Sequence, residues 1–147
     1  MSRNNPQQNR QKNNDKESEN VKKLKEKLSN ESIAEFSEKD IFHPEEGYVK
    51  KAIEDINITA VQLRKVFQEF KAIRDGLKKD ENVEEALKKL YKLYAILEYQ
   101  AKRGVLDKDF KELMFRLFDN IERNKSKKAF EKAYDLLMAM VAYSKKS

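Results

Sequence analysis

The sequence has no cysteine and no tryptophan, and only three glycines, two prolines and one histidine among 147 residues. Without cysteine there is no disulfide framework, no thiolate zinc site and no cysteine nucleophile. The single histidine, His43, leaves little for histidine-based catalysis. So few glycines and prolines cannot supply the turns of a β-sandwich or barrel. The composition therefore favours a few long helices.

Long apolar runs are also missing. No stretch of 18 apolar residues occurs, so no membrane span is predicted. The N-terminus lacks the apolar segment of a secretory signal, and we expect a cytoplasmic protein. Charge is abundant instead: 32 Lys and Arg against 26 Asp and Glu give a net charge of +6. Most of this excess follows residue 40, in the part predicted to fold, which suggests a polyanionic partner.

The pattern of apolar residues divides the chain into three parts. Residues 1–20 contain nine Asn and Gln and no large apolar residue after Met1, so we predict a disordered tail. Residues 21–44 carry a thin apolar stripe and are predicted to form a marginal helix and a connection, ordered only if they dock. Residues 45–147 are predicted to form the folded domain.

The domain is predicted to be an all-α, antiparallel bundle of about five helices. Apolar residues recur at helical spacing in successive segments, and connections of three to six residues favour antiparallel neighbours. Pro44 is predicted to open the first helix, and Gly76 and Gly104 to end two others. The expected N-caps of the other four helices are Thr59, Asn82, Asp107 and Ser126.

Two predicted helices carry informative polar positions. In residues 60–75 the side opposite the apolar stripe holds Arg64, Gln68, Lys71 and Asp75. Residues 82–103 have a wide apolar stripe and a second side with Lys92, Ile96, Tyr99 and Arg103. A helix that is apolar on more than one side is usually central in its bundle, so we expect this helix at the centre. Its extra apolar surface also suggests self-association or assembly.

A search for catalytic groups is mostly negative. The adjacent pairs Glu45–Glu46 and Glu84–Glu85 point about 100° apart on a helix, and neither has a Glu-x-x-His partner for a di-iron site. His43 beside Pro44 fits a loop or capping residue better than a general base. We therefore expect no catalytic residue, no metal site and no cofactor.

Cations are better candidates for function than aromatic side chains. Arg64, Lys71 and Arg103 are placed to follow phosphates, although an ordinary solvated face explains them as well. Stacking of a base on Tyr91, Tyr94 or Tyr99 is physically feasible, but their spacing favours core or interface use.

Four stretches together resemble the small helical subunit of type III-A CRISPR–Cas (Csm) effector complexes. Residues 58–65, ITAVQLRK, are similar to the family's Thr-x-x-Gln-[Ile/Leu]-Arg helix start. Residues 90–103, LYKLYAILEYQAKR, resemble its long helix with a Tyr-x-x-x-Arg ending. Residues 130–134 and 142–145 resemble the last helix with its Ala-Tyr-x-Lys close. The similarity covers roughly residues 45–147.

The resemblance implies a non-catalytic subunit of a ribonucleoprotein that acts in antiviral defence. Such subunits pack beside the other Csm subunits and line the path of the CRISPR RNA and the target RNA. The RNA contacts that this resemblance implies are Arg64 and Lys65 of the Gln-Leu-Arg-Lys stretch and Arg103 of the Tyr-x-x-x-Arg stretch. Lys71 is added by helix geometry alone.

Two other classes of function stay open. One is a helical protein–protein adaptor without RNA binding, self-associating as a homodimer or not, whose lysines serve solubility. The other is a small helical enzyme such as a ribonuclease, for which the sequence offers no constellation of catalytic groups. Binding to RNA that weakens with salt would separate the expected subunit from the adaptor.

Overall fold

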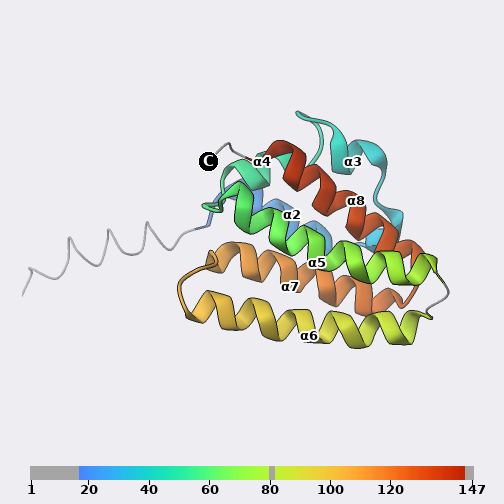
Figure 1. The fold of residues 1–147 in the computed structure, drawn as a ribbon. Helices are drawn as coiled ribbons and strands as arrows, with labels where there is room; N and C mark the ends of the chain where they lie inside the picture. Colours follow the sequence, from blue (N-terminus) through green and yellow to red (C-terminus); the bar gives the residue numbers. More distant parts are fainter. Residues whose placement is uncertain (1–16, 80–81, 145–147) are drawn as a thin grey trace, which may run out of the picture.

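The computed structural model describes residues 17–79 and 82–144, and all its regular structure in these ranges is helical (Figure 1). This confirms the predicted all-α class. None of the described helices is long and apolar enough to cross a membrane. In chain order the elements are α2 (Glu19–Asn30), the short 3₁₀ helix η1 (Ile33–Glu35), α3 (Glu38–Phe42), α4 (Val49–Glu54), α5 (Ala60–Lys78), α6 (Val83–Lys102), α7 (Lys108–Asn124) and α8 (Lys127–Tyr143).

Side-chain caps set the starts of the four long C-terminal helices. Each cap accepts a hydrogen bond from the backbone N–H three residues on, as the sequence predicted for Thr59, Asn82, Asp107 and Ser126. Gly104 follows α6 with a φ of 78°, a conformation that glycine adopts without strain. The predicted end at Gly76 is wrong, because α5 continues through Gly76 to Lys78.

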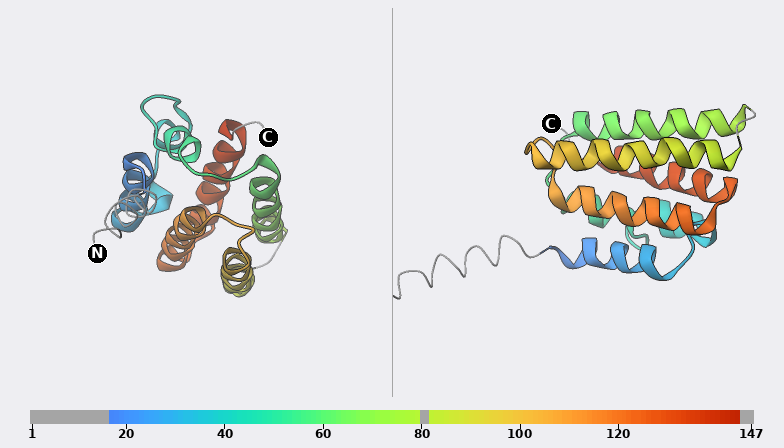
Figure 2. Two further views of the ribbon diagram at one scale, coloured as in Figure 1. Left: turned by 90° about the vertical axis from the view of Figure 1, so that its left-hand side faces the viewer. Right: turned by 90° about the horizontal axis from the view of Figure 1, so that it is seen from below.

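The central helix is α8, which packs against α3, α4, α5, α7 and η1. Viewed along the helices, α8 lies among its neighbours, whereas α6 lies at the outer edge beside α5 and α7 (Figure 2). The prediction that the helix of residues 82–103 is central is therefore wrong. Its second apolar side is left open to solvent, with Ile96 42% and Tyr99 61% exposed.

The N-terminal segment docks on the bundle through α2, which packs against α7 and α4. Its stripe of Val21, Leu24 and Leu28 is buried. The helix starts at Glu19 with Ser18 as its N-cap, so it begins inside the stretch predicted as a tail. Residues 1–16 of that predicted tail lie outside the described residues.

A turn, not a helix, follows Pro44, so the prediction that Pro44 opens a helix is wrong. Nδ1 of His43 accepts hydrogen bonds from the backbone N–H groups of Glu45 and Glu46, and α4 starts only at Val49. Gly47 donates to the carbonyl oxygen of His43. These hydrogen bonds hold the turn together around the imidazole. They agree with the prediction that His43 is a loop or capping residue.

Candidate nucleic-acid interface

The residues Arg64 and Lys65 lie in the second turn of α5. The opposite side of this helix is buried, through Leu63, Val66, Phe70, Ile73 and Leu77. This apolar stripe fixes the rotation of α5, so both cations point outward and are exposed. Neither makes an ion pair or side-chain hydrogen bond with another described residue. Their charges are therefore available to an anionic partner.

Lys71 differs from these two cations because it already has a partner. Its Nζ lies 3.0 Å from Oδ2 of Asp75, one turn further along α5. The hydrogen bond from Lys71 holds the pKa of the Asp75 carboxyl below its ordinary value. The carboxylate offsets much of the positive charge of Lys71. An anionic partner is therefore attracted less strongly by Lys71 than by Arg64 or Lys65.

Arg103 stands at the C-terminal end of α6 and is exposed. Its guanidinium carbon lies 5.5 Å from the centre of the Tyr99 ring. The start of α5 reaches the same end of the bundle, because the side chain of Gln62 donates to the carbonyl oxygen of Val105, just beyond α6. The start of α5 and the end of α6 lie at the same end of the bundle (Figure 1). By their positions in these helices, Arg64, Lys65 and Arg103 are at this end, and Lys71 lies two turns further along α5.

A shallow groove runs between α5 and α6. One hollow of about 340 Å³ is lined by Glu69, Ala72, Ile73, Lys89, Lys92, Leu93 and Ile96. A smaller hollow continues it and is lined by Lys65, Val66, Glu69, Leu93, Ile96, Leu97 and Gln100. Lys65 therefore borders the groove from α5, and Lys92 borders it from α6. The sequence analysis placed Lys92 on the same side of its helix as Ile96, Tyr99 and Arg103. It did not predict an RNA contact for Lys92.

The three tyrosines of α6 have different surroundings. The Tyr94 ring packs on Phe115 and Phe118, and its hydroxyl lies 2.6 Å from Asp119. Burial and this hydrogen bond raise the pKa of the Tyr94 phenol. The Tyr91 hydroxyl lies 3.0 Å from Glu122, and the hydrogen bond raises the pKa of its phenol. The Tyr99 hydroxyl has no partner in the described part of the chain.

One cation that the sequence analysis did not single out is buried. Arg74 on α5 packs its guanidinium carbon 3.7 Å from the centre of the Tyr134 ring on α8. Its Nε lies 3.5 Å from Oδ1 of Asp75. This arginine joins two helices and is shielded from solvent, so it is no part of the exposed cationic surface.

No group of three or more His, Cys, Asp or Glu side chains suited to hold a metal occurs among the described residues. At the end of the bundle that carries Arg64, Lys65 and Arg103, the surface offers exposed cations to an anion, next to the exposed ring of Tyr99.

Comparison with known proteins adds one finding. The family model of Csm2 Type III-A matches residues 45–147. Neither the curated proteins nor the solved structures gave a match to this chain.

Proposed function

The chain belongs to the Csm2 Type III-A family and is a small subunit of a type III-A CRISPR effector complex, and we propose that it lines the path of the guide and target RNA. In this role it is a non-catalytic, cytoplasmic component of antiviral defence. It contacts RNA through Arg64, Lys65 and Arg103, with Lys71 as a weaker contact. Its other partners are the remaining subunits of the complex.

The observation that carries this proposal is the pair of exposed, unpartnered cations on α5. Arg64 and Lys65 form no ion pair with a described residue, whereas Lys71 does. Contacts from side-chain cations to phosphates are independent of sequence. Such binding suits a subunit that follows an RNA of any sequence.

The test is to change Arg64 and Lys65 together to Glu and to measure affinity for a single-stranded RNA over a salt series. Three phosphate contacts predict a log-affinity against log-salt slope of roughly −2 for the unchanged chain. We expect the double variant to bind many times more weakly, with a shallower slope. Unchanged affinity and slope in a folded variant would contradict the proposal.

A matched control is the double change of Lys22 and Lys23 to Glu. Both lysines are exposed on α2 and have no partner among the described residues. The change in net charge is the same, but α2 packs against α7 and α4 and not against α5 (Figure 2). The control separates a local contact from an effect of overall charge. Thermal melting shows that each variant is folded.

A helical adaptor that binds no RNA is the alternative, and exposed apolar side chains favour it. Val61 is 66% exposed and Ile96 42% exposed on the outer surfaces of α5 and α6. Such side chains suit contacts with other subunits or with a second copy of the chain. RNA binding that is absent, or that does not weaken with salt, would support the adaptor. Light scattering over a concentration series would show self-association.

A further inference from the structure

Tyr99 is the one α6 tyrosine whose ring packs on no other aromatic ring and whose hydroxyl has no partner among the described residues. Its side chain lies at the end of the helix, and the residue is 61% exposed. Tyr91 and Tyr94 both use their hydroxyls on carboxylates of α7, and their rings lie 6.3 Å apart. Within the described residues, Tyr99 makes no aromatic ring contact and no hydroxyl hydrogen bond. The Tyr99 ring therefore lacks the aromatic contacts that the Tyr91 and Tyr94 rings make.

The surroundings of Tyr99 are cationic. The Arg103 guanidinium lies over the ring, 5.5 Å from its centre. One turn before Tyr99, Ile96 lines the groove between α5 and α6 together with Lys65 and Gln100, and the groove also contains one carboxylate residue, Glu69. Lys92 lines the same groove further along α6. An exposed aromatic ring among cations is the arrangement by which proteins hold single-stranded nucleic acid, with the ring stacking a base and the cations contacting phosphates.

We propose that Tyr99 stacks on an unpaired base of the bound RNA while Arg103 and Lys65 hold the adjoining phosphates. This inference rests on the proposed function and adds a contact to a base to the contacts with the backbone. The stacking surface accepts any base, because every base has a flat aromatic face. It requires a single-stranded stretch, since a base paired in a helix is stacked between its neighbours and does not expose its face.

The test compares a single-stranded RNA with a ribose-phosphate strand of the same length that has no bases. We expect Tyr99→Ala to weaken binding of the RNA about fivefold or more, which is the lower end of the loss when a base-stacking aromatic is removed. Binding of the strand without bases should not change, because its phosphate contacts remain. Tyr99→Phe should bind RNA as the unchanged chain does, since stacking needs the ring and not the hydroxyl.

Tyr91→Ala is the matched control. Tyr91 is 48% exposed on the same helix, but its hydroxyl is held by Glu122 and it lies away from Arg103. We expect this variant to bind RNA as the unchanged chain does. Equal losses for Tyr99→Ala on both strands, or no loss on either, would overturn the inference. A Tyr99→Ala variant that binds RNA normally but loses a neighbouring subunit would also overturn it and would identify Tyr99 as a protein contact.

The proposed function is tested separately by the Arg64 and Lys65 double variant. If that variant loses RNA binding while Tyr99→Ala does not, the stacking inference fails and the proposed function stands. If the unchanged chain binds no RNA at all, both fail.

Discussion

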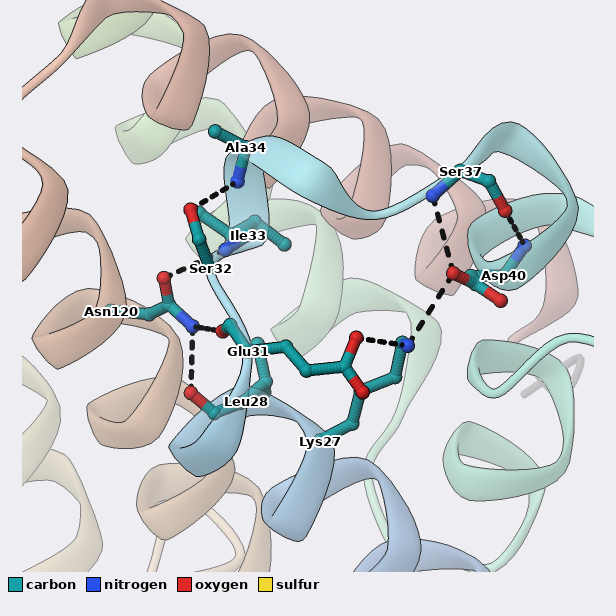
Figure 3. A network of polar contacts seen from close by, with 9 residues as sticks. All are labelled: Lys27, Leu28, Glu31, Ser32, Ile33, Ala34, Ser37, Asp40 and Asn120. Carbon is teal, nitrogen blue, oxygen red and sulfur yellow. Dashed lines mark hydrogen bonds and ion pairs between the residues drawn. The ribbon is translucent and has the colours of Figure 1, made fainter.

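The side-chain amide of Asn120 on α7 donates to the backbone carbonyl oxygen of Glu31 at 2.7 Å, just beyond the end of α2. The same amide nitrogen lies 2.6 Å from the carbonyl oxygen of Leu28, and Oδ1 accepts from the N–H of Ile33 at 2.8 Å (Figure 3). Asn120 is fully buried. One side chain therefore satisfies backbone groups at the end of α2 and at the start of η1, and it ties the N-terminal segment to the bundle.

Replacement of Asn120 should destabilise the protein strongly. Asn120→Ala leaves the buried N–H of Ile33 and the carbonyl of Glu31 without these partners, which costs roughly 2–4 kcal/mol in the free energy of unfolding. Urea denaturation measures the loss. Asn30→Ala is the control, because Asn30 is exposed at the end of α2 and should change stability by less than about 0.5 kcal/mol. Equal effects of the two substitutions would contradict this reading of the network.

The sequence predicted the four long C-terminal helices because their signals are local. Apolar spacing and the caps Thr59, Asn82, Asp107 and Ser126 depend only on residues within a few positions of each other. The docking of α2 depends on Asn120, which lies about 90 positions away from Leu28 and Glu31. The spacing of apolar residues within residues 21–42 does not indicate a contact with so distant a residue. The segment was therefore predicted to form only a marginal helix.

At the candidate interface, too, the sequence predicted the local features but not those that depend on the whole fold. Helix geometry placed Arg64 and Lys71 on one polar side of α5, and both lie there. Geometry alone did not show that Asp75 pairs with Lys71, although their spacing of four residues permits it. The apolar residues of α6 were correctly divided between two sides. Which side the bundle covers depends on the position of α6 at its edge, and that is a property of the whole fold.

The acidic cap of α3 should make stability depend on pH. Asp40 accepts from Ser37 N–H, and its Oδ2 lies 3.4 Å from Nζ of Lys27 (Figure 3). Burial tends to raise the pKa of the Asp40 carboxyl, but the Ser37 hydrogen bonds and the Lys27 charge hold it below its ordinary value. The stabilisation by the Asp40 carboxylate is therefore complete above about pH 3.9, the pKa of an Asp carboxyl in the unfolded chain. It is lost as the pH falls through the lower pKa of the same carboxyl in the folded protein.

Asp40→Asn tests this pH dependence. Asparagine keeps an oxygen that can accept from Ser37 but removes the charge that faces Lys27. We expect the variant to be less stable than the unchanged chain at pH 7. The difference should start to shrink at about pH 4, where the carboxyl of the unfolded chain takes up a proton, and should vanish once the pH has fallen below the lower pKa of the folded Asp40 carboxyl. Urea denaturation at several pH values from 3 to 7 measures the difference. A difference of the same size at every pH would contradict a role for the charge.

Gly47 should tolerate no side chain. A Cβ at this position would lie 2.5 Å from the carbonyl oxygen of His43 and 2.8 Å from that of Lys39. Both neighbours are backbone atoms, one within α3 and one at its C-terminal cap, so they cannot rotate away. Gly47→Ala should cost about 3 kcal/mol, the upper end of overpacking effects. Gly104→Ala meets no atom within 4 Å but must adopt a φ of 78°, and should cost only about 1–2 kcal/mol. The reverse order in thermal or urea denaturation would contradict this explanation.

His43 should be replaceable by asparagine but not by glutamine. The turn uses Nδ1 of the imidazole, which accepts from Glu45 N–H at 3.1 Å and from Glu46 N–H at 2.9 Å. The Oδ1 atom of asparagine lies close to the position of Nδ1, whereas the Oε1 atom of glutamine lies closer to that of Nε2. His43→Gln should therefore lose about 0.5–2 kcal/mol, as when a helix cap is lost, and His43→Asn much less. Equal stability of the two variants would show that these bonds do not hold the turn.

Release of Lys71 from Asp75 should strengthen RNA binding. In the unchanged chain the carboxylate lies 3.0 Å from Nζ of Lys71, so Lys71→Ala should weaken binding less than Arg64→Ala does. Asp75→Asn removes the competing anion without removing the lysine, and thermal melting checks that the loss of the carboxylate beside the buried Arg74 leaves the protein folded. We expect affinity for single-stranded RNA to rise a few fold and the salt slope to steepen by about 0.7, the value of one phosphate contact on a single strand.

The control for this prediction is Glu54→Gln, which makes the same change in net charge. It frees Lys50 on α4 from an ion pair of similar length, 3.1 Å, and similar exposure. Lys50 lies outside the proposed RNA surface, so its release should leave affinity and slope unchanged. Adding Lys71→Ala to Asp75→Asn should then remove the gain, because the gain requires the freed ammonium group. If Glu54→Gln raises affinity as much as Asp75→Asn, the effect comes from net charge alone, and Lys71 is not an RNA contact.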